Sequence, residues 1–393
     1  MAKTAIEFAG IKMRNPFVVA SGPPGATVDR IVKCEDNGAG AVVTKLVLVK
    51  QPWPGRLRMY SVPGEASIVN HDRRLDLDDG LELVRKSKER TEIPIIVNIT
   101  HPAEDPDGWV RLAKELEQAG ADGLELNLIC PNISFATVRM GQSVSESHGA
   151  VIGQKPESVE FVTRTVSSAV KIPVIPKLTT NVADITVTGE AAVRGGAKGV
   201  CMAGGQSGLP KVDIYNQGKP LYYCVDGVSY GSMGGPAILN QSFALTAQLA
   251  KALPIPVMGG GGISTWQDCI MFMMWGARAV TACTIIMWER FSVIKDLVTG
   301  MERFLDEAGY DSIEEIIGLS QRHLKTSKEL KVTDGCIAID DNQCISCLKC
   351  VDLGHCDAIV EDNGNPKVIP DQCVACGICL GVCPQQAIVM NEK

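Results

Sequence analysis

The sequence predicts an α/β protein in which a (β/α)8 TIM barrel is followed by a smaller, cysteine-rich α+β domain. Eight short apolar runs alternate with amphipathic stretches of helical periodicity over about 300 residues. Buried strands flanked by helices indicate a parallel sheet that is covered on both faces. The turn after the first strand, Ala20–Gly25, lacks a G-x-G-x-x-G pattern, which favours a closed barrel over a doubly wound sheet. We place the barrel at residues 1–311, a helix and linker at 312–336, and the second domain at 337–393.

The strands and helices of the barrel follow from this alternation. Representative helical stretches are Gly108–Gly120, Ser158–Val170 and Ile238–Leu253. Several stretches end in Gly-Ala-x-Gly or Gly-Ala-x-Ala, where glycine ends the helix and alanine lets the next strand pack closely. The eight predicted strands are Phe17–Ser21, Ala41–Leu48, Pro94–Thr100, Gly123–Cys130, Pro173–Leu178, Gly199–Ala203, Pro256–Gly260 and Ala279–Ile285.

Two connections are longer than the others, 49–76 after the second strand and 131–155 after the fourth. Both follow carboxyl ends of strands, where barrel enzymes carry their chemistry. The second is rich in small polar residues, so we expect a mobile lid. A third excursion, 206–235, is expected to form an inserted ribbon, and Ile313–His323 is expected to be helical.

The second domain contains two near copies of one cysteine pattern. Cys-x2-Cys-x2-Cys triplets begin at Cys344 and at Cys373, and each is followed by a fourth cysteine, Cys356 or Cys383. This is the ligand spacing of two-cluster bacterial ferredoxins, in which the fourth cysteine binds the other cluster. The pattern predicts two [4Fe–4S] clusters, one held by Cys344, Cys347, Cys350 and Cys383, the other by Cys373, Cys376, Cys379 and Cys356.

Zinc and disulfides are the competing interpretations of these cysteines. Zinc would leave the third cysteine of each triplet without a role, and disulfides need an oxidising compartment. One departure from the pattern is the five residues between Cys350 and Cys356, where three are usual. We expect this longer arm to alter the exposure or potential of one cluster without removing a ligand.

Composition limits the class of protein. The net charge is -7 with no dense Lys/Arg run, which argues against binding to nucleic acid or an anionic membrane. No apolar run has membrane-spanning length, and Glu7 does not fit a signal peptide. Fifteen cysteines then indicate metal ligands and reduced thiols. We expect a cytoplasmic protein of an anaerobic or oxygen-protected cell.

Three features at the expected barrel mouth carry chemistry. Cys130 ends the fourth strand beside Asn127 and Asn132, where a thiol can act as a general acid or base, although a strand-end cysteine is more often buried filler. Lys45 and Lys177 lie in apolar strands, which is costly unless their charges have a partner such as a flavin ring. One such lysine could instead extend to the barrel rim.

The third feature is a pair of turns that follow the last two strands. The seventh strand runs into Gly259–Gly262, and the eighth runs into Cys283 and Thr284. Turns at these two positions form the usual phosphate site of the barrel. Four glycines alone are a weak signal, but at this position they predict a phosphorylated cofactor of FMN size.

Taken together, these stretches resemble the dihydroorotate and dihydropyrimidine dehydrogenase family over essentially the whole chain. The resemblance also includes the order of the two domains. The matching stretches are Asn15–Phe17, Ala20–Ser21, Thr44–Lys45, Asn70, Leu126–Leu128, Cys130–Pro131, Gly153–Gln154, Pro156–Glu157, Lys177–Thr179, Asn181–Val182, Asp184–Ile185, Ser207–Leu209, Tyr230–Gly231, Gly235, Ala237–Ile238 and Gly261–Ile263.

The resemblance implies an oxidoreductase acting on CH–CH bonds. FMN would exchange hydride through N5 with one carbon of a C=C bond of a pyrimidine such as uracil or thymine, and Cys130 would exchange a proton with its neighbour. The two clusters would carry electrons singly. The resemblance implies that Lys45 and Lys177 contact the flavin ring and that Asn70 and Asn127 bind the pyrimidine. The whole predicted FMN site is Ala20, Ser21, Lys45, Lys177, Gly235, Gly261, Gly262, Cys283 and Thr284, and the whole predicted substrate site is Asn70, Asn127, Asn132 and Gln206.

The chain departs from the family pattern at the substrate site. Gly204 and Gly205 stand where the family has an Asn-Thr pair, Ile129 replaces a serine, and the lid is longer. Losing an amide that pairs with a polar ring edge costs about 1–3 kcal/mol. Either Gln206 substitutes for it, or the substrate is a different unsaturated ring.

The resemblance also bears on partners. Because no dinucleotide fold is expected, electrons would be exchanged with an NAD(P)H-oxidising flavoprotein subunit or a ferredoxin. We expect a dimeric core within a hetero-oligomer. A role as an electron-relay subunit is the alternative from another class, and Cys130 argues against it because electron transfer needs no thiol at the mouth.

Overall fold

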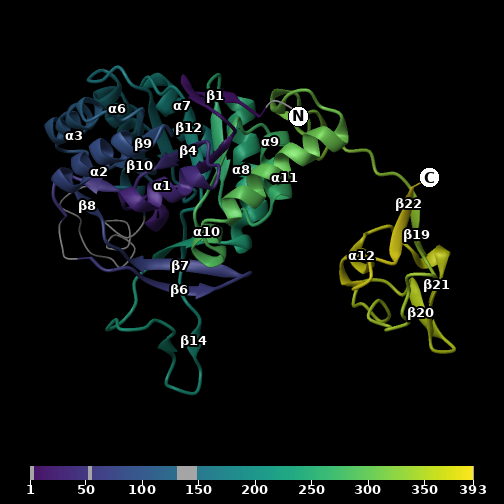
Figure 1. Cartoon of the computed structure of the whole chain (residues 1–393). Helices are drawn as coiled ribbons and strands as arrows, with labels where there is room; N and C mark the ends of the chain where they lie inside the picture. The colour runs from purple at the N-terminus through teal and green to yellow at the C-terminus, as the bar shows by residue number, and fades with distance from the viewer. Residues whose placement is uncertain (1–3, 52–54, 131–147, 393) are drawn as a thin grey trace. The chain divides into compact units, whose positions relative to one another are not determined.

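The computed structural model describes residues 4–51, 55–130 and 148–392. The chain divides into two compact units, Met1–His323 and Leu324–Lys393. The first unit contains a closed barrel of eight parallel strands (Figure 1), in which β10 pairs with both β9 and β11. The predicted fold class is therefore confirmed. Around the barrel the strands are β3 (Phe17–Val19), β4 (Ala41–Val43), β9 (Ile95–Ile99), β10 (Gly123–Leu128), β11 (Val174–Leu178), β12 (Val200–Ala203), β17 (Val257–Gly260) and β18 (Ala279–Ala282).

All eight predicted strands exist, but each is at least one residue shorter than expected, and two differ most from their predicted bounds. The run Ala41–Leu48 divides into β4 and a separate β5 (Val47–Leu48), because the Lys45 amide between them bonds to Gly25 instead of a barrel strand. The predicted strand Ala279–Ile285 is wrong at its end, since α10 (Thr284–Glu289) begins there. Apolar β-branched runs such as this one also fit a buried helix, so their pattern does not locate the transition.

Helices follow the strands and cover the outside of the barrel (Figure 1). In α3, for example, Trp109, Leu112 and Leu116 recur at helical spacing and are fully buried. The helices are α1 (Val28–Asp36), α2 (Leu77–Arg90), α3 (Pro106–Gln118), α5 (Ala150–Gly153), α6 (Pro156–Ser167), α7 (Ile185–Arg194), α8 (Leu239–Ala252), α9 (Trp266–Met274), α10 and α11 (Val293–Ala308). None in the described part of the chain combines the length and apolar character needed to cross a bilayer.

An amino-terminal hairpin, β1 (Ile6–Phe8) and β2 (Ile11–Met13), packs at the start of the barrel strands. Phe8 is fully buried, and a Cβ added to Gly199, just before β12, would lie 2.9 Å from its ring. The hairpin therefore closes the end of the barrel opposite the carboxyl ends of the strands.

At the carboxyl ends, two long connections combine into one antiparallel sheet of order β13-β16-β7-β6. The ribbon expected within 206–235 is confirmed, whereas 49–76 is not simply a loop but contains a hairpin. β8 (Leu75–Asp76) also comes from this connection and pairs with β5. The four strands of the sheet are β6 (Arg58–Val62), β7 (Ala66–His71), β13 (Gln206–Gly208) and β16 (Gly231–Gly234).

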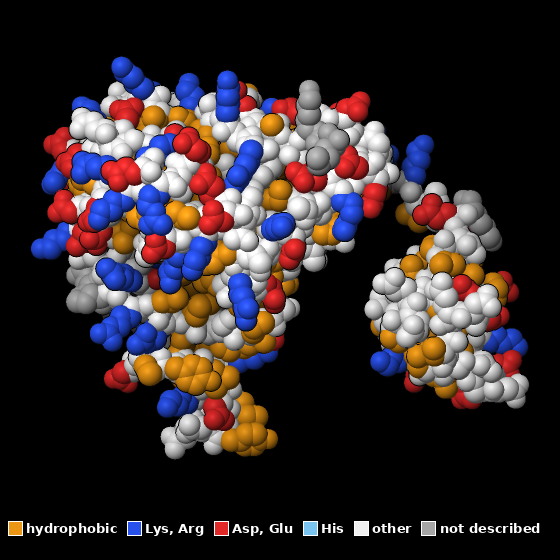
Figure 2. All heavy atoms as spheres, viewed as in Figure 1, with side chains coloured by type: hydrophobic (Ala, Val, Ile, Leu, Met, Phe, Trp, Pro, Cys, Tyr) orange, Lys and Arg blue, Asp and Glu red, His pale blue; other side chains and the backbone are white. Residues whose placement is uncertain are grey.

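Between β13 and β16 the chain forms a smaller ribbon that projects from the barrel unit (Figure 1). Its strands are β14 (Val212–Asp213) and β15 (Lys219–Pro220). Tyr215 and Tyr223 are 94% and 80% exposed, and the apolar tip is visible in Figure 2.

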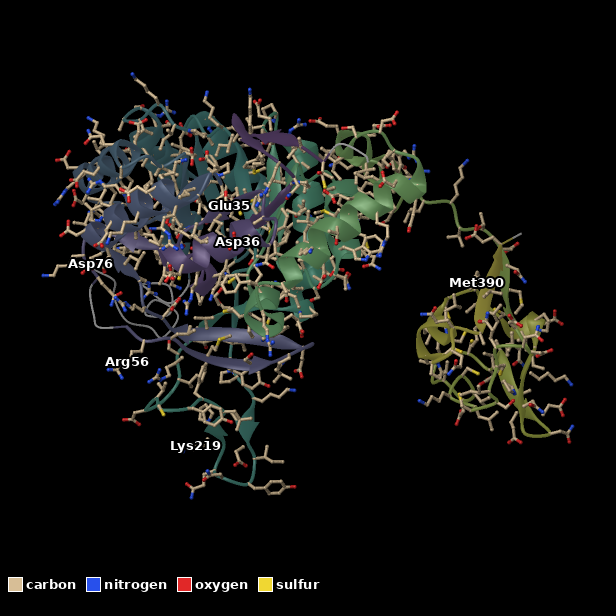
Figure 3. The ribbon with its side chains drawn as sticks, viewed as in Figure 1. Glu35, Asp36, Arg56, Asp76, Lys219 and Met390 are labelled. Carbon is tan, nitrogen blue, oxygen red and sulfur yellow. The ribbon has the colours of Figure 1, made fainter. Side chains whose placement is uncertain are left out.

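The Leu324–Lys393 unit contains two antiparallel strand pairs and one short helix. Its buried core consists of four side chains, with the Met390 side chain of β22 (Figure 3) packed against them. The four are Ile337, Ile359, Cys379 and Ile388. The elements are β19 (Gly335–Ile339) paired with β22 (Ile388–Glu392), β20 (Ile359–Asp362) paired with β21 (Asn365–Val368), and α12 (Ile378–Val382).

The helix predicted at Ile313–His323 is wrong. The segment forms two short 3-10 helices, Ile313–Ile316 and Gln321–His323, within the barrel unit. Ile313 and Ile316 are fully buried, and Gly318 between the helices has φ +79°, a conformation that interrupts a helix.

Candidate functional site

A cavity at the carboxyl ends of the barrel strands brings together most of the predicted barrel residues. Its empty space, open mouth included, is about 1130 Å³, enough for a cofactor with a ring system and a phosphate. Predicted residues that line it are Ala20, Ser21, Lys45, Asn127, Cys130, Lys177, Gly235, Gly261, Gly262, Cys283 and Thr284.

The remaining predicted substrate residues are not brought to this cavity by the described structure. Gln206 lies on β13, paired with Met233, and is not among the lining residues. Asn70 lies on β7, but its side chain is outside the description. Asn132 and most of the predicted lid lie outside the described residues.

The strand register explains how a polar network forms inside the barrel. Glu125 and Asn127 are two positions apart on β10 and therefore point to the same face. Asn98 pairs with Glu125 across β9 and β10, and Lys177 pairs with Asn127 across β10 and β11. Pairing also places Cys201 of β12 opposite Lys177. Four neighbouring strands thus bring these polar side chains together.

Hydrogen bonds join the network into one chain. Lys177 Nζ lies 3.4 Å from Glu125 Oε1, which also accepts a bond of 2.6 Å from Asn98 Nδ2. Asn127 Nδ2 donates to Asn98 Oδ1 over 3.0 Å, and the Cys130 backbone N–H donates to Asn127 Oδ1 over 3.0 Å. A continuous path therefore connects the Lys177 ammonium with the backbone of Cys130.

The groups around Lys177 keep its ammonium charged. Burial by itself lowers the pKa of Lys177, but attraction to the Glu125 carboxylate, with smaller contributions from Cys201 and Cys283, leaves the pKa raised. Lys177 is therefore a fixed positive charge at the cavity, since its carboxylate partner is only 1% exposed.

Lys45 has a different partner, Asp72, which the sequence analysis did not single out. The two side chains form an ion pair that lines the cavity. Asp72 is 15% exposed and lies on the connection between β7 and β8, not on a barrel strand. Its only sequence signal is a carboxylate in a long loop at the carboxyl end of a strand. Both barrel lysines thus have the charge partner that their burial requires.

Cys130 sits half-buried where β10 leaves the barrel. Its carbonyl accepts a hydrogen bond from the Ala150 N–H, and a Cβ added to Gly149 would lie 2.5 Å from that carbonyl oxygen. Its backbone is therefore fixed from two directions, by Asn127 and by the start of α5. The thiol of a residue held in this way can be directed at a substrate in the cavity.

The glycine turn after β17 is built for a close backbone approach. Gly261 and Gly262 have φ of +96° and +97°, and a Cβ on either would lie 2.7 Å from a backbone atom of Gly204 or Leu239. Their N–H groups suit a phosphate. At the start of the following helix α9, the capping box of Thr265 and Asp268 already engages the backbone N–H groups of these two residues.

Two further observations fit a bound cofactor. Thr281 Oγ1 on the cavity wall is buried without a hydrogen-bond partner among the described residues, as expected where a ligand supplies one. Burial raises the pKa of Cys283 to about 11 despite Lys45 and Lys177, so its thiol is neutral. A Cβ on Gly22 would lie 2.4 Å from Cys283 Sγ, which explains the glycine after Ala20 and Ser21.

Ile129 and Gly205, two positions at which the chain departs from the family pattern, lie against each other at the substrate side of the cavity. Ile129 is buried and lines the cavity, and a Cβ added to Gly205 would lie 2.1 Å from Ile129 Cγ1. The isoleucine therefore fills the space that a side chain at 205 would need, which makes this wall apolar.

A second cavity adjoins the mouth and shares Lys45, Asp72 and Arg74 with it. Arg56 and Asp76, both labelled in Figure 3, also line it. Arginines and carboxylates are mixed there, as on the surface seen in Figure 2.

In the cysteine-rich unit, each of two cavities is lined by one of the two predicted sets of four cysteines, and Cys350 lines both cavities. Four thiols on a shared cavity are a donor set that fits a cubane cluster. His355, which the sequence analysis did not include, has a ring nitrogen within 4.8 Å of the Cys356 and Cys376 sulfurs. One cavity is lined by Cys344, Cys347, Cys350 and Cys383, the other by Cys350, Cys356, Cys373, Cys376 and Cys379.

Comparison with family models accounts for both units. A model described as dihydroorotate dehydrogenase matches residues 3–305. A model described as 4Fe-4S binding domain matches residues 366–389, which include the second cysteine triplet and Cys383.

Individual relatives agree with both matches. The catalytic subunit of dihydroorotate dehydrogenase B (NAD(+)) from Pyrococcus furiosus is 34% identical over 81% of this chain and 98% of its own length. The corresponding protein of Methanosarcina acetivorans is 33% identical over 79% of this chain and 94% of its own length. The NAD-dependent dihydropyrimidine dehydrogenase subunit PreA of Escherichia coli K12 is 27% identical over 99% of this chain and 95% of its own length. The chain belongs to the dihydroorotate dehydrogenase family of flavoprotein oxidoreductases, joined here to a 4Fe–4S binding domain.

Proposed function

We propose that the protein uses FMN and two [4Fe–4S] clusters to add or remove two hydrogens across the C=C bond of a pyrimidine such as uracil or thymine. The observation that carries the proposal is the cavity that joins Lys45, Lys177 and Cys130, in a chain with two further cavities of four or more cysteines. A relay of electrons alone would not need a positioned thiol.

The chain's residues divide the work in this proposal. FMN, when bound, supplies hydride chemistry at N5. Lys177 stabilises negative charge on the flavin ring, and the glycine turn at 261–262 binds the phosphate. Cys130 Sγ gives a proton to the neighbouring ring carbon in the reductive direction and takes it back in the oxidative direction. Asn127 binds the polar edge of the ring, with Asn70 and Asn132 as further candidates.

The clusters connect this site with a partner. Each cluster carries one electron at a time, so two clusters together match the two electrons that are transferred in one hydride. The relatives are named as subunits of NAD-dependent or NAD(+)-linked enzymes, which supports an NAD(P)H-oxidising flavoprotein subunit as partner, with ferredoxin as the alternative. A dimeric core bound to that subunit remains our proposal for the assembly, in the cytoplasm.

A different unsaturated ring is the second candidate substrate. It is favoured by the contact of Ile129 with Gly205, because an apolar wall leaves a polar ring edge without a partner there. Gln206 does not line the cavity and so gives no support to its proposed role as the replacement.

Both candidates can be tested by following flavin oxidation without oxygen. The reduced protein is mixed with uracil, thymine and a panel of other unsaturated heterocycles, and flavin absorbance is recorded. Rapid oxidation by a pyrimidine supports the leading proposal, and oxidation only by other rings supports the second candidate.

A Cys130→Ala variant tests the role of the thiol. We expect substrate-dependent oxidation to fall by about 10²-fold or more, while reduction by an artificial donor is unchanged. Unchanged turnover of substrate would contradict the assignment of Cys130 as acid and base.

A further inference from the structure

We infer that Glu125 is a positioning residue that serves both halves of the reaction, by holding Lys177 at the flavin and by orienting Cys130 through Asn98 and Asn127. This inference rests on the proposed function and deepens it. Glu125 touches neither the cavity nor the reacting atoms, and its effect passes through the side chains bonded to it.

The first arm of this inference, from Glu125 to Lys177, is electrostatic. Glu125 is the only carboxylate within 4.0 Å of the Lys177 ammonium among the described residues, and both side chains are more than nine-tenths buried. The other titratable groups that act on Lys177 are the thiols of Cys201 and Cys283. Without the carboxylate, burial would oppose the charge on Lys177, and the lysine would begin to titrate in the neutral to alkaline range.

The second arm, from Glu125 through Asn98 and Asn127 to Cys130, is geometric. Asn98 is fully buried and spans the gap between Glu125 and Asn127, donating to one and accepting from the other. This fixes which end of the Asn127 amide faces the Cys130 backbone, because only its carbonyl oxygen can accept that N–H. If Asn98 is lost, the Asn127 amide can rotate and the Cys130 loop loses its fixed acceptor.

Substitutions separate the two arms. In Glu125→Gln, the amide oxygen still accepts from Asn98 but the charge is gone. We expect the flavin reduction potential, measured between about pH 6 and 10, to gain a pH-dependent break that the wild type lacks, as Lys177 loses its proton. Asn98→Ala should leave the potential and its pH profile unchanged, yet slow flavin oxidation by substrate about tenfold or more at saturating substrate.

Cys201→Ala is the matched control, since Cys201 is a third buried neighbour of Glu125 and lies outside the hydrogen-bond path to Cys130. Burial raises the pKa of Cys201 well above its usual value, so its thiol is neutral and its removal takes no charge away from Lys177. This variant should change neither measurement. A flavin-loaded Glu125→Gln protein with the wild-type pH profile, or an Asn98→Ala protein with wild-type substrate oxidation, would overturn the inference while the proposed function stands. A wild-type chain that takes up no flavin would overturn the proposed function and this inference with it.

Discussion

The barrel and the cysteine-rich unit are stabilised in different ways. The barrel has one continuous core in which large side chains such as Phe17, Trp109 and Phe272 are fully buried. The core of the smaller unit has four buried side chains, and one of them, Cys379, is a predicted cluster ligand. A domain with so little apolar core needs another source of stability, and structural metal sites supply one.

The two units are therefore expected to differ in how much their folding depends on a bound cofactor. The barrel holds both lysines in ion pairs of its own and packs its glycine turn against neighbouring backbone, so the contacts that shape the cavity come from the chain itself. Barrel Gly261 and Gly262 would clash with any Cβ, whereas Gly364 and Gly377 of the smaller unit have no atom within 4 Å of an added Cβ.

Removal of iron should affect the folding of the two units differently. Chelation under oxidising conditions is expected to unfold residues 337–393, because the proposed clusters would supply the stability that so small a core lacks, while the barrel stays folded. All five tryptophans precede residue 289, so their fluorescence reports the barrel alone. Limited proteolysis should cut only the smaller unit. Equal protection of both units after iron loss would contradict the comparison.

Thiol alkylation of the iron-free protein should distinguish the buried cysteines of the barrel from the cysteines of the smaller unit. Burial, with a contribution from Cys283, raises the pKa of Cys34 to about 12, and that of Cys283 is raised to about 11. Near pH 8 only on the order of one in 10³–10⁴ of these thiols is ionised, whereas roughly a quarter of an unfolded unit's thiols with a pKa of about 8.5 is ionised. The barrel thiols should therefore react about 10²–10³-fold more slowly.

The rate at the barrel thiols should rise about tenfold per pH unit up to their pKa, because each unit of pH raises the thiolate fraction tenfold. Mass mapping of carboxamidomethyl groups against time checks both expectations. Rapid labelling of Cys34 at pH 8 would show that the barrel had opened.

Within the barrel, the two lysines should differ in what their removal costs. Lys177→Met leaves Glu125 buried without a counter-charge, which should destabilise the barrel by about 3–5 kcal/mol. Lys45→Met leaves Asp72, which is 15% exposed against 1% for Glu125, and should therefore cost less than Lys177→Met. Urea unfolding followed by tryptophan fluorescence measures both. Equal losses would mean that burial of the carboxylate partner does not decide the cost.

The smallest effects should come from alanine at glycines of positive φ. Gly262→Ala combines an unfavourable φ with a contact to the Leu239 backbone and should cost about 1–3 kcal/mol and weaken FMN binding. Gly364→Ala meets no atom and should cost about 1 kcal/mol from conformation alone. Flavin content and the thermal loss of cluster absorbance are the respective measurements. FMN binding unaffected by Gly262→Ala would exclude that turn from the phosphate site.

Much of this architecture was predictable because local patterns determine it. Apolar runs of β-branched residues between amphipathic stretches located all eight strands, and cysteine spacing predicted the crosswise division seen in the two thiol-lined cavities. Where the pattern allows two structures, as at Thr284–Glu289, prediction was wrong.

Contacts between distant segments were not predictable. β7 and β16 come from different connections and pair only in the folded chain, and the contact of Ile129 with Gly205 arises similarly. Asn98 and Glu125 did leave a signal, since each is a polar residue inside a buried strand. The same reasoning that singled out the lysines would have found them, but their pairing depends on strand register.

The crosswise division of the cysteines has a consequence for biogenesis. Because Cys356 shares a cavity with the second triplet, and Cys383 shares one with the first, the second set of thiols is complete only after translation has passed residue 379, and the first only after it has passed residue 383. Iron–sulfur delivery to this protein should therefore be a concerted, post-translational event, and a nascent chain halted between the two triplets should capture no intact cluster.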